Sequence, residues 1–114
     1  MGEDLALDWL LAHGLRLRDR NWRSAHKEID LVMESPGRVH VVEVKTLVPP
    51  LSHQPYEKVD AAKRANLTAA ARRYIAEKHV REEVQFDVVS VVLDGPDTVI
   101  EYIPEAFYPI HGKY

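Results

Sequence analysis

Hydrophobic and polar residues alternate over two neighbouring stretches, residues 28–34 and 39–45, which flank the polar sequence Ser35-Pro36-Gly37-Arg38. Alternation with a period of two is typical of β-strands, because successive side chains on a strand point to opposite faces. A short sequence with proline and glycine between two such stretches indicates a tight turn. The pattern therefore predicts a β-hairpin, and the rest of the chain is interpreted around it.

The charged residues of this hairpin fall on one face of each strand. Asp30 shares its face with Glu28 and Val32, and Glu43 shares its face with Lys45. If the register brings Asp30 opposite Glu43, two carboxylates and one ammonium group meet on one surface. Neighbouring carboxylates need a cation or a proton, and their oxygens suit Mg²⁺ or Mn²⁺. The cluster favours metal-assisted phosphodiester hydrolysis, in which the lysine orients a water or neutralises a phosphate. The alternative is a solvated hairpin face with cross-strand ion pairs.

The remaining hydrophobic pattern predicts two helices and three further strands. Residues 88–93 are apolar on both faces, which is typical of a buried strand in a parallel arrangement. A long helix before this strand would serve as the crossover from the hairpin. We therefore expect one α/β domain over residues 1–114, with a mixed sheet made of a three-strand antiparallel meander and a parallel crossover strand, flanked by helices. The expected helices cover residues 3–13 and 57–79, and the other strands cover residues 15–23, 84–93 and 98–103.

Several segments have two interpretations. Residues 46–56 contain three prolines and act either as a flap over the site or as a solvated connector. Asp87 either caps or pairs with an arginine, or lies in the outer shell of the site. Phe107 and Tyr108, in an aromatic tail, are expected to pack on the sheet. The six histidines show no metal-binding spacing and are interpreted as surface or turn residues, with His53 the one in the flap.

Composition limits the class of protein. The chain has 114 residues, of which 46% are hydrophobic and 29% charged, and its net charge is −3. It has no cysteine, which excludes disulfides and thiolate metal sites. No apolar run is long enough to span a membrane and the N-terminus does not resemble a secretory signal, so we expect a cytoplasmic protein without membrane contact. The negative charge means that nucleic acid would have to bind at local basic patches.

Basic residues for such patches occur in two places. Arg16, Arg18 and Arg20 alternate with other residues in the expected edge strand and would share one face, with Arg23 opposite. They form either a charged edge that discourages strand pairing or a rim that contacts phosphates. In the long helix, most basic residues suit a solvated surface, whereas Lys63 and Arg64 could reach a phosphate. The candidate nucleic-acid-binding residues are Arg20, Arg23, Lys63 and Arg64.

An ordered set of short motifs runs through nearly the whole chain. It is similar to the core of the PD-(D/E)xK nuclease superfamily, the restriction-endonuclease-like fold, with an acid in the second strand and Glu-x-Lys in the third. More closely, the chain resembles the small bacterial YraN family, which is itself similar to archaeal Holliday-junction resolvases. The matching residues are Gly2-Glu3, Arg20-Asn21-Trp22-Arg23, Glu28-Ile29-Asp30-Leu31, Val42-Glu43-Val44-Lys45-Thr46, Lys63 and Phe86-Asp87-Val88-Val89.

The resemblance implies roles for individual residues. Asp30 and Glu43 match the metal-binding acids, Lys45 the catalytic lysine, and Glu3 the acid in the first helix of the resolvase-like branch. The carbonyl of Val44, between the acid and the lysine, is a further candidate metal ligand. The implied activity is Mg²⁺- or Mn²⁺-dependent cleavage of DNA, including branched recombination intermediates, by a homodimer.

The sequence also departs from the family pattern. Lys27 stands where the family usually has glycine, Leu47 replaces a frequent arginine, and the expected flap carries a proline pair. A nucleic-acid-binding or scaffold protein that keeps the fold with little turnover is therefore the alternative function.

Overall fold

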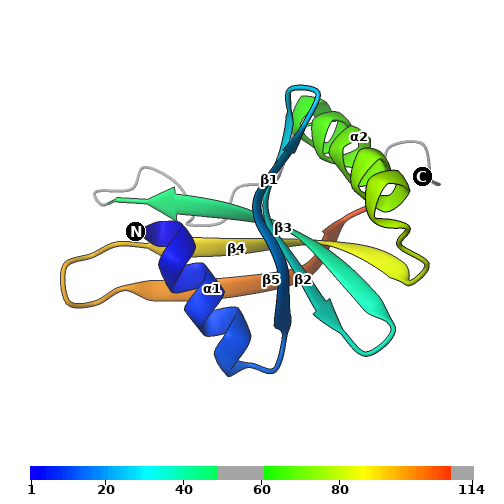
Figure 1. Cartoon of the computed structure of the whole chain (residues 1–114). Helices are drawn as coiled ribbons and strands as arrows, with labels where there is room; N and C mark the ends of the chain where they lie inside the picture. The colour runs from blue at the N-terminus through cyan, green and yellow to red at the C-terminus, as the bar shows by residue number, and fades with distance from the viewer. Residues whose placement is uncertain (49–60, 109–114) are drawn as a thin grey trace.

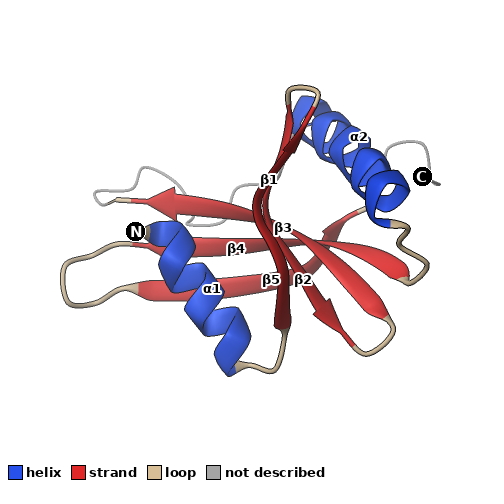
Figure 2. Ribbon diagram, in the orientation of Figure 1, coloured by secondary structure: helices blue, strands red, loops and turns tan. Residues whose placement is uncertain are grey.

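A computed structural model describes residues 1–48 and 61–108 of the chain. These residues form two helices and five strands (Figures 1 and 2). The expected helix at 57–79 is confirmed for its described part, from residue 61 onward. Most of the expected flap at 46–56 lies outside the described residues, from residue 49 on, and so does His53. The elements are α1 (Gly2–Ala12), β1 (Arg16–Ser24), β2 (Lys27–Ser35), β3 (Arg38–Leu47), α2 (Ala61–Lys78), β4 (Glu83–Val92) and β5 (Val99–Phe107).

The five strands form one sheet in chain order, β1-β2-β3-β4-β5. The first three strands are an antiparallel meander, β4 runs parallel to β3, and β5 pairs antiparallel with β4. Helix α2 lies in the connection between the two parallel strands, as the buried character of β4 predicts. The predicted α/β class with a mixed sheet is therefore confirmed, and it is compatible with a restriction-endonuclease-like core. That all 114 residues belong to one domain stays a prediction.

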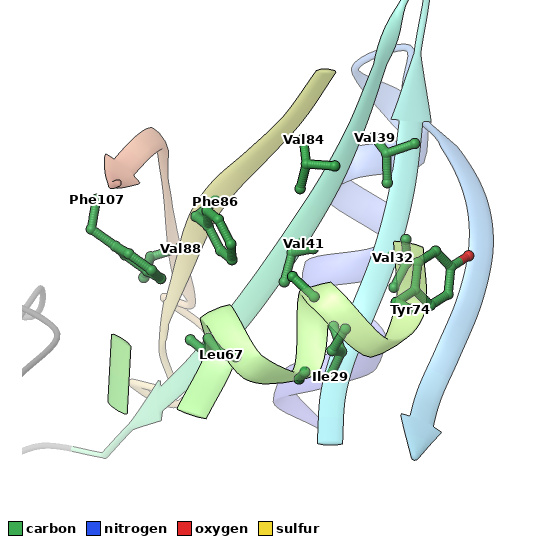
Figure 3. Close-up of a cluster of buried hydrophobic side chains, with 12 residues drawn as sticks. Ile29, Val32, Val39, Val41, Leu67, Tyr74, Val84, Phe86, Val88 and Phe107 are labelled. Carbon is green, nitrogen blue, oxygen red and sulfur yellow. The ribbon is translucent and has the colours of Figure 1, made fainter. Parts of the chain in front are cut away.

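The sheet carries a hydrophobic core on each face. On one face, α1 buries Ala6 and Leu10 against strand residues that include Leu31 and Val42. On the other face, α2 buries Leu67 and three further residues against the sheet, and Figure 3 shows this cluster. Val42 and Val44 therefore belong to the α1 face, and the alternate positions of β3 face α2. The buried strand residues under α2 are Ile29, Val32, Val39, Val41, Val84, Phe86, Val88 and Phe107.

The beginning of α1 packs closely against the end of β3. A Cβ atom on Gly2 would lie 1.9 Å from Thr46 Oγ1 and 2.9 Å from Thr46 Cβ. Glycine therefore allows the first turn of the helix to contact the strand that carries Glu43. At the other end of α1, Gly14 has φ +96°, as expected for a glycine that follows a helix.

Strand β1 changes the direction of its side chains twice, and this corrects one prediction. The register with β2 shifts between Leu17 and Asp19, and Asn21 has φ +51°. Arg18 lies over the ring of Tyr74 on the α2 face, whereas Arg20 pairs with α1. The prediction that Arg18 and Arg20 share a face is wrong, because a bulge and a left-handed residue interrupt strict alternation.

The last strand is longer than predicted. β5 continues past Pro104 to Phe107, through a register shift against β4 in which Glu105 has φ +49°. Phe107 is buried and stacks on Phe86 with 5.0 Å between ring centroids, as expected. Tyr108 is 73% exposed, so the expectation that it packs on the sheet is wrong. Within the described ranges no helix is long and apolar enough to span a membrane.

Candidate metal and phosphate site

The site begins where β2 separates from β3. The two strands pair from Ser35↔Arg38 to Leu31↔Val42, and this register would continue with Asp30 opposite Glu43 and Ile29 opposite Val44. Neither of these pairs forms. The backbone N–H of Val44 instead donates a hydrogen bond of 2.9 Å to Asp30 Oδ2. The Asp30 carboxylate thus takes the place of a backbone carbonyl of β2 as the acceptor for this N–H. We call the opening between β2 and β3 beyond the Leu31↔Val42 pair the slot.

Strand β1, on the other side of β2, is also irregular at the level where β2 separates from β3. The β1–β2 register places Asn21, with its positive φ, opposite Asp30, between the pairs Arg20↔Leu31 and Trp22↔Ile29. On β2, Leu31 belongs to the α1 face, whereas Ile29 packs in the α2 cluster. Both strands therefore turn at this point. Asp30 shares the α2 face with Val32 by alternation, and the turn brings Ile29 to that face as well.

Asp30 and Glu43 meet in the slot as a pair of carboxyl groups. Glu43 is buried and Asp30 is half-buried. Burial, followed by the hydrogen-bonding contact and charge of Glu43, raises the pKa of Asp30 to about 6, although the Val44 N–H and the charge of Lys63 oppose this rise. The observed register thus brings the two acids together, as the metal-site interpretation of the hairpin requires, and their proximity disfavours two negative charges.

The cation beside the acids is Lys63, and not Lys45. Lys63 Nζ lies 2.6 Å from Glu43 Oε2, with the lysine side chain 52% exposed and the glutamate side chain 8% exposed. Lys45 is half-buried, and the described residues give it no salt bridge. Lys45, the lysine that the sequence places in this cluster, is therefore not the one that pairs with Glu43. Helix α2, far away in the sequence, supplies the charge.

A cavity of about 240 Å³ opens over the acid pair. The β1–β2 hairpin forms one wall and α2 the other, and a hydrogen bond of 3.1 Å from Lys27 Nζ to Asn66 Oδ1 links the walls. The cavity therefore presents the carboxylates of Asp30, Glu43 and Glu28 together with cationic and amide groups. Its lining residues are His26, Lys27, Glu28, Asp30, Glu43, Lys63, Asn66 and Leu67.

The groups at the base of the cavity fit a divalent cation. In an extended strand the N–H and C=O of one residue point toward the same neighbour, so the Val44 carbonyl faces the slot together with its N–H. Two carboxylates and a carbonyl are hard oxygen donors, and an ammonium group already lies against one of them. Within residues 1–48 and 61–108, no three acidic or imidazole side chains are arranged so that they could hold a metal ion together. Mg²⁺ accepts this donor set, because it usually keeps several waters and binds one or two carboxylates with substrate phosphates.

Glu3 is not brought to this pair. Its Oε1 lies 3.0 Å from Arg20 Nε, and the same guanidinium pairs with Asp4. Arg20 is therefore neutralised by the first turn of α1, on the face opposite to α2. The catalytic role of Glu3 and the phosphate-binding role of Arg20 stay predictions that this geometry does not support.

The other two candidate phosphate-binding residues lie on either side of the site. Arg23 is exposed, 3.5 Å from Glu28, beside a second hollow that shares His26 and Lys27 with the main cavity. Arg64 is half-buried in the first turns of α2, and its buried Nε has no hydrogen-bond partner in the described structure. Such a donor would be satisfied by an oxygen acceptor that reaches it.

A buried polar network lies away from the acid pair and was not predicted. His40 Nδ1 lies 2.7 Å from Asp87 Oδ2, and His40 Nε2 lies 2.7 Å from Ser35 Oγ. Asp87 also accepts hydrogen bonds from Tyr102 Oη and from the backbone N–H of Glu105. The order Ser–His–Asp is that of a nucleophile relay. With so many bonds on the aspartate, however, the network holds four strands together.

This network corrects two predictions, and the sequence indicated it only weakly. His40 is buried, so it is neither a surface nor a turn residue, and Asp87 pairs with a histidine rather than an arginine. Burial alone would raise the pKa of Asp87, but the hydrogen bonds, first that of His40, hold this pKa below its ordinary value. Two polar residues inside otherwise apolar strands were the available signal, because buried polar groups need partners.

Comparison with known proteins identifies relatives along nearly the whole chain. A model described as "Uncharacterised protein family UPF0102" matches residues 2–91. A UPF0102 protein of Bacteroides thetaiotaomicron is 38% identical over 108 residues, covering 95% of this chain and 89% of the relative. A UPF0102 protein of Chromohalobacter salexigens is 38% identical over 105 residues, covering 92% of this chain and 85% of the relative. The chain therefore belongs to the UPF0102 family, the YraN-like family that its motifs resemble.

Proposed function

We propose that the protein is a metal-dependent endonuclease of the PD-(D/E)xK type, a hydrolase that cleaves DNA phosphodiesters. One observation carries the proposal: Asp30 and Glu43 meet where two strands separate, with a lysine ammonium 2.6 Å from the second acid. Substrates of the proposed enzyme include branched recombination or repair intermediates, and its assembly is a homodimer, both by analogy with resolvases. A cytoplasmic location is part of the proposal.

Each residue of the site has a defined task in this proposal. Asp30, Glu43 and the Val44 carbonyl would hold Mg²⁺ or Mn²⁺, which supplies charge stabilisation at the phosphate and a water of lowered pKa. The Val44 N–H fixes the orientation of the Asp30 carboxylate. By strand alternation Lys45 lies on the same face as Glu43, where its ammonium group would hold the attacking water.

A nuclease assay tests the proposal. Purified protein is incubated with Mg²⁺ or Mn²⁺ and with single-stranded, duplex and four-way-junction DNA, and the Asp30→Asn variant is the matched control. We expect metal-dependent cleavage of at least one substrate by the parent and none by the variant. Cleavage by both proteins would indicate a contaminating nuclease, and cleavage by neither on all three substrates would contradict the proposal.

Binding of DNA is tested separately from cleavage. Neutralising Arg23 and Arg64 should weaken binding to unrelated sequences equally and flatten its salt dependence, since phosphate contacts carry no sequence information. Arg20, which is held by two acids on the other face, serves as the comparison. Equal losses from the Arg20 and Arg23 variants would mean that the bound DNA is not confined to the cavity side.

A second candidate function is nucleic-acid binding with little turnover. It is favoured by the salt bridge of Lys63, which occupies one of the two acids, and by the lack, in the described ranges, of three acids or histidines arranged to hold a metal ion together. The two candidates differ in one measurement: a binding protein would retain DNA at the cavity without metal-dependent cleavage of any of the three DNA forms.

A further inference from the structure

The salt bridge between Lys63 and Glu43 joins two groups with opposite environments. The glutamate side chain is 8% exposed on a central strand, so it cannot move away from the site. The lysine side chain is 52% exposed on a helix, and its flexible stem lets the ammonium group change position. If this salt bridge opens, it is therefore Lys63 that moves to another partner, while Glu43 stays in place.

The positive charge of Lys63 compensates the negative charge of the acid pair when no metal ion is bound there. A buried carboxylate beside a second carboxylate is costly unless a positive charge or a proton compensates it. Lys27, the other lysine that lines the cavity, donates to Asn66 instead. Lys63 is thus the lysine that neutralises the acid pair in this structure.

A metal ion at the acid pair would compete with that ammonium group. Both cations would share the Glu43 carboxylate, and they would repel each other at short range. The groups that line the cavity with Lys63 include Lys27, His26 and Asn66, which can all donate hydrogen bonds, and Glu28, whose carboxylate lies 3.5 Å from Arg23. An ammonium group displaced toward these donors would form, with them, a site for an anion such as a phosphate.

We propose that Lys63 has two alternative partners: it pairs with Glu43 in the metal-free protein, and it binds a substrate phosphate once a metal ion takes its place on the glutamate. This inference rests on the proposed nuclease function. In the metal-free protein Lys63 would not bind phosphate, because its ammonium group is paired with Glu43. Phosphate binding by Lys63 would therefore depend on metal binding.

The first test measures affinity for Mn²⁺ alone by calorimetry, without DNA, for the parent, Lys63→Met and Lys27→Met. Both variants remove one positive charge from the same cavity, but only the first removes a charge bound to the acids. We expect Lys63→Met to bind Mn²⁺ about fivefold more tightly than the parent, and Lys27→Met to change the affinity by less than about twofold. An equal effect of the two variants, or no gain for Lys63→Met, would overturn the proposal while leaving a metal site in place.

The second test follows thermal stability in EDTA and in excess Mn²⁺. Lys63→Met should have a lower Tm than the parent in EDTA, because Glu43 loses its partner, and a larger rise of Tm on adding Mn²⁺. Lys63→Gln, which keeps a hydrogen-bond donor without charge, provides the same comparison if the Met variant does not fold. Equal Mn²⁺-induced shifts in parent and variant would contradict the exchange.

The third test measures affinity for a phosphorothioate DNA strand, which resists hydrolysis, with and without Mn²⁺. The parent should gain affinity on adding Mn²⁺, and Lys63→Met should lose most of this gain even though it binds the metal more tightly. A full gain in the variant would refute the phosphate-binding half of the proposal. If the parent binds no Mn²⁺ under any of these conditions, the exchange and the proposed nuclease mechanism both fail.

Discussion

Replacing Asp30 with asparagine should make the metal-free protein more stable at neutral pH. The carboxyl group has a raised pKa because burial and the nearby Glu43 disfavour its charged form. Asparagine has the same shape and keeps an oxygen that can accept the Val44 N–H, so the strand geometry need not change. The substitution removes a disfavoured charge and keeps the hydrogen bond.

The magnitude follows from the two pKa values. Asp30 titrates at about 6 in the folded chain and at 3.8 in the unfolded chain. Between these values only the folded chain retains the proton, so the free energy of unfolding of the parent falls as pH rises through this window. The full difference corresponds to roughly 3 kcal/mol. Screening by solvent at this half-buried group reduces the expected gain of the Asn variant to roughly 1–2 kcal/mol at pH 7.5.

Denaturant unfolding in EDTA at pH 4, 5.5 and 7.5 measures this effect. The stability advantage of Asp30→Asn should grow across the series and be smallest at pH 4, where the carboxyl is protonated in the folded chain and only partly ionised in the unfolded chain. Asp8→Asn, the same change at an exposed position of α1, should alter stability by less than about 0.5 kcal/mol at each pH. A variant that is no more stable than the parent at pH 7.5 would refute the reasoning, because the acid pair would then be stabilised rather than strained.

Three further predictions concern the rest of the site and the fold. Glu43→Gln and Lys45→Ala should each lower the DNA cleavage rate by about 10²- to 10⁴-fold with DNA affinity kept, and near-parental rates in a gel assay would remove that residue from the mechanism. Asp87→Asn should cost roughly 2–3 kcal/mol at pH 7 in denaturant unfolding; because the folded-state pKa is lowered, this loss should shrink as pH falls below about 4, and a constant loss would exclude the ionised carboxylate as its cause. Gly2→Ala should cost roughly 1–3 kcal/mol by its clash with Thr46, and a smaller cost in a Thr46→Ala background would identify that contact.

The part of the fold that follows from local pattern could be predicted from the sequence. Alternation fixed the faces of Val42, Glu43 and Val44, and the apolar character of β4 indicated a parallel partner. The tight turn at Ser35–Arg38 also set the register that brings Asp30 to Glu43. These features depend on residues close together in the chain, or on burial alone.

The features that could not be predicted depend on contacts between distant residues. Lys63 reaches Glu43 because of where α2 lies along β3. The spacing of residues in the sequence does not specify that position. The opposite directions of Arg18 and Arg20 come from a bulge and from the positive φ of Asn21, and asparagine only weakly signals that conformation. The pairing of His40 with Asp87 joins residues on two strands whose register was unknown.

The dual role of Asp30 determines how variants of this site must be interpreted. Its carboxylate replaces a backbone acceptor at the point where β2 leaves β3, so it contributes to the opening as well as to the chemistry inside it. Removing the side chain with alanine would leave the Val44 N–H without an acceptor, a cost of roughly 1–3 kcal/mol, and would also let the strands rearrange. Lost cleavage in an alanine variant would therefore have two explanations. Because asparagine retains the acceptor and removes only the charge, lost cleavage in Asp30→Asn reports on the chemistry of the acid pair.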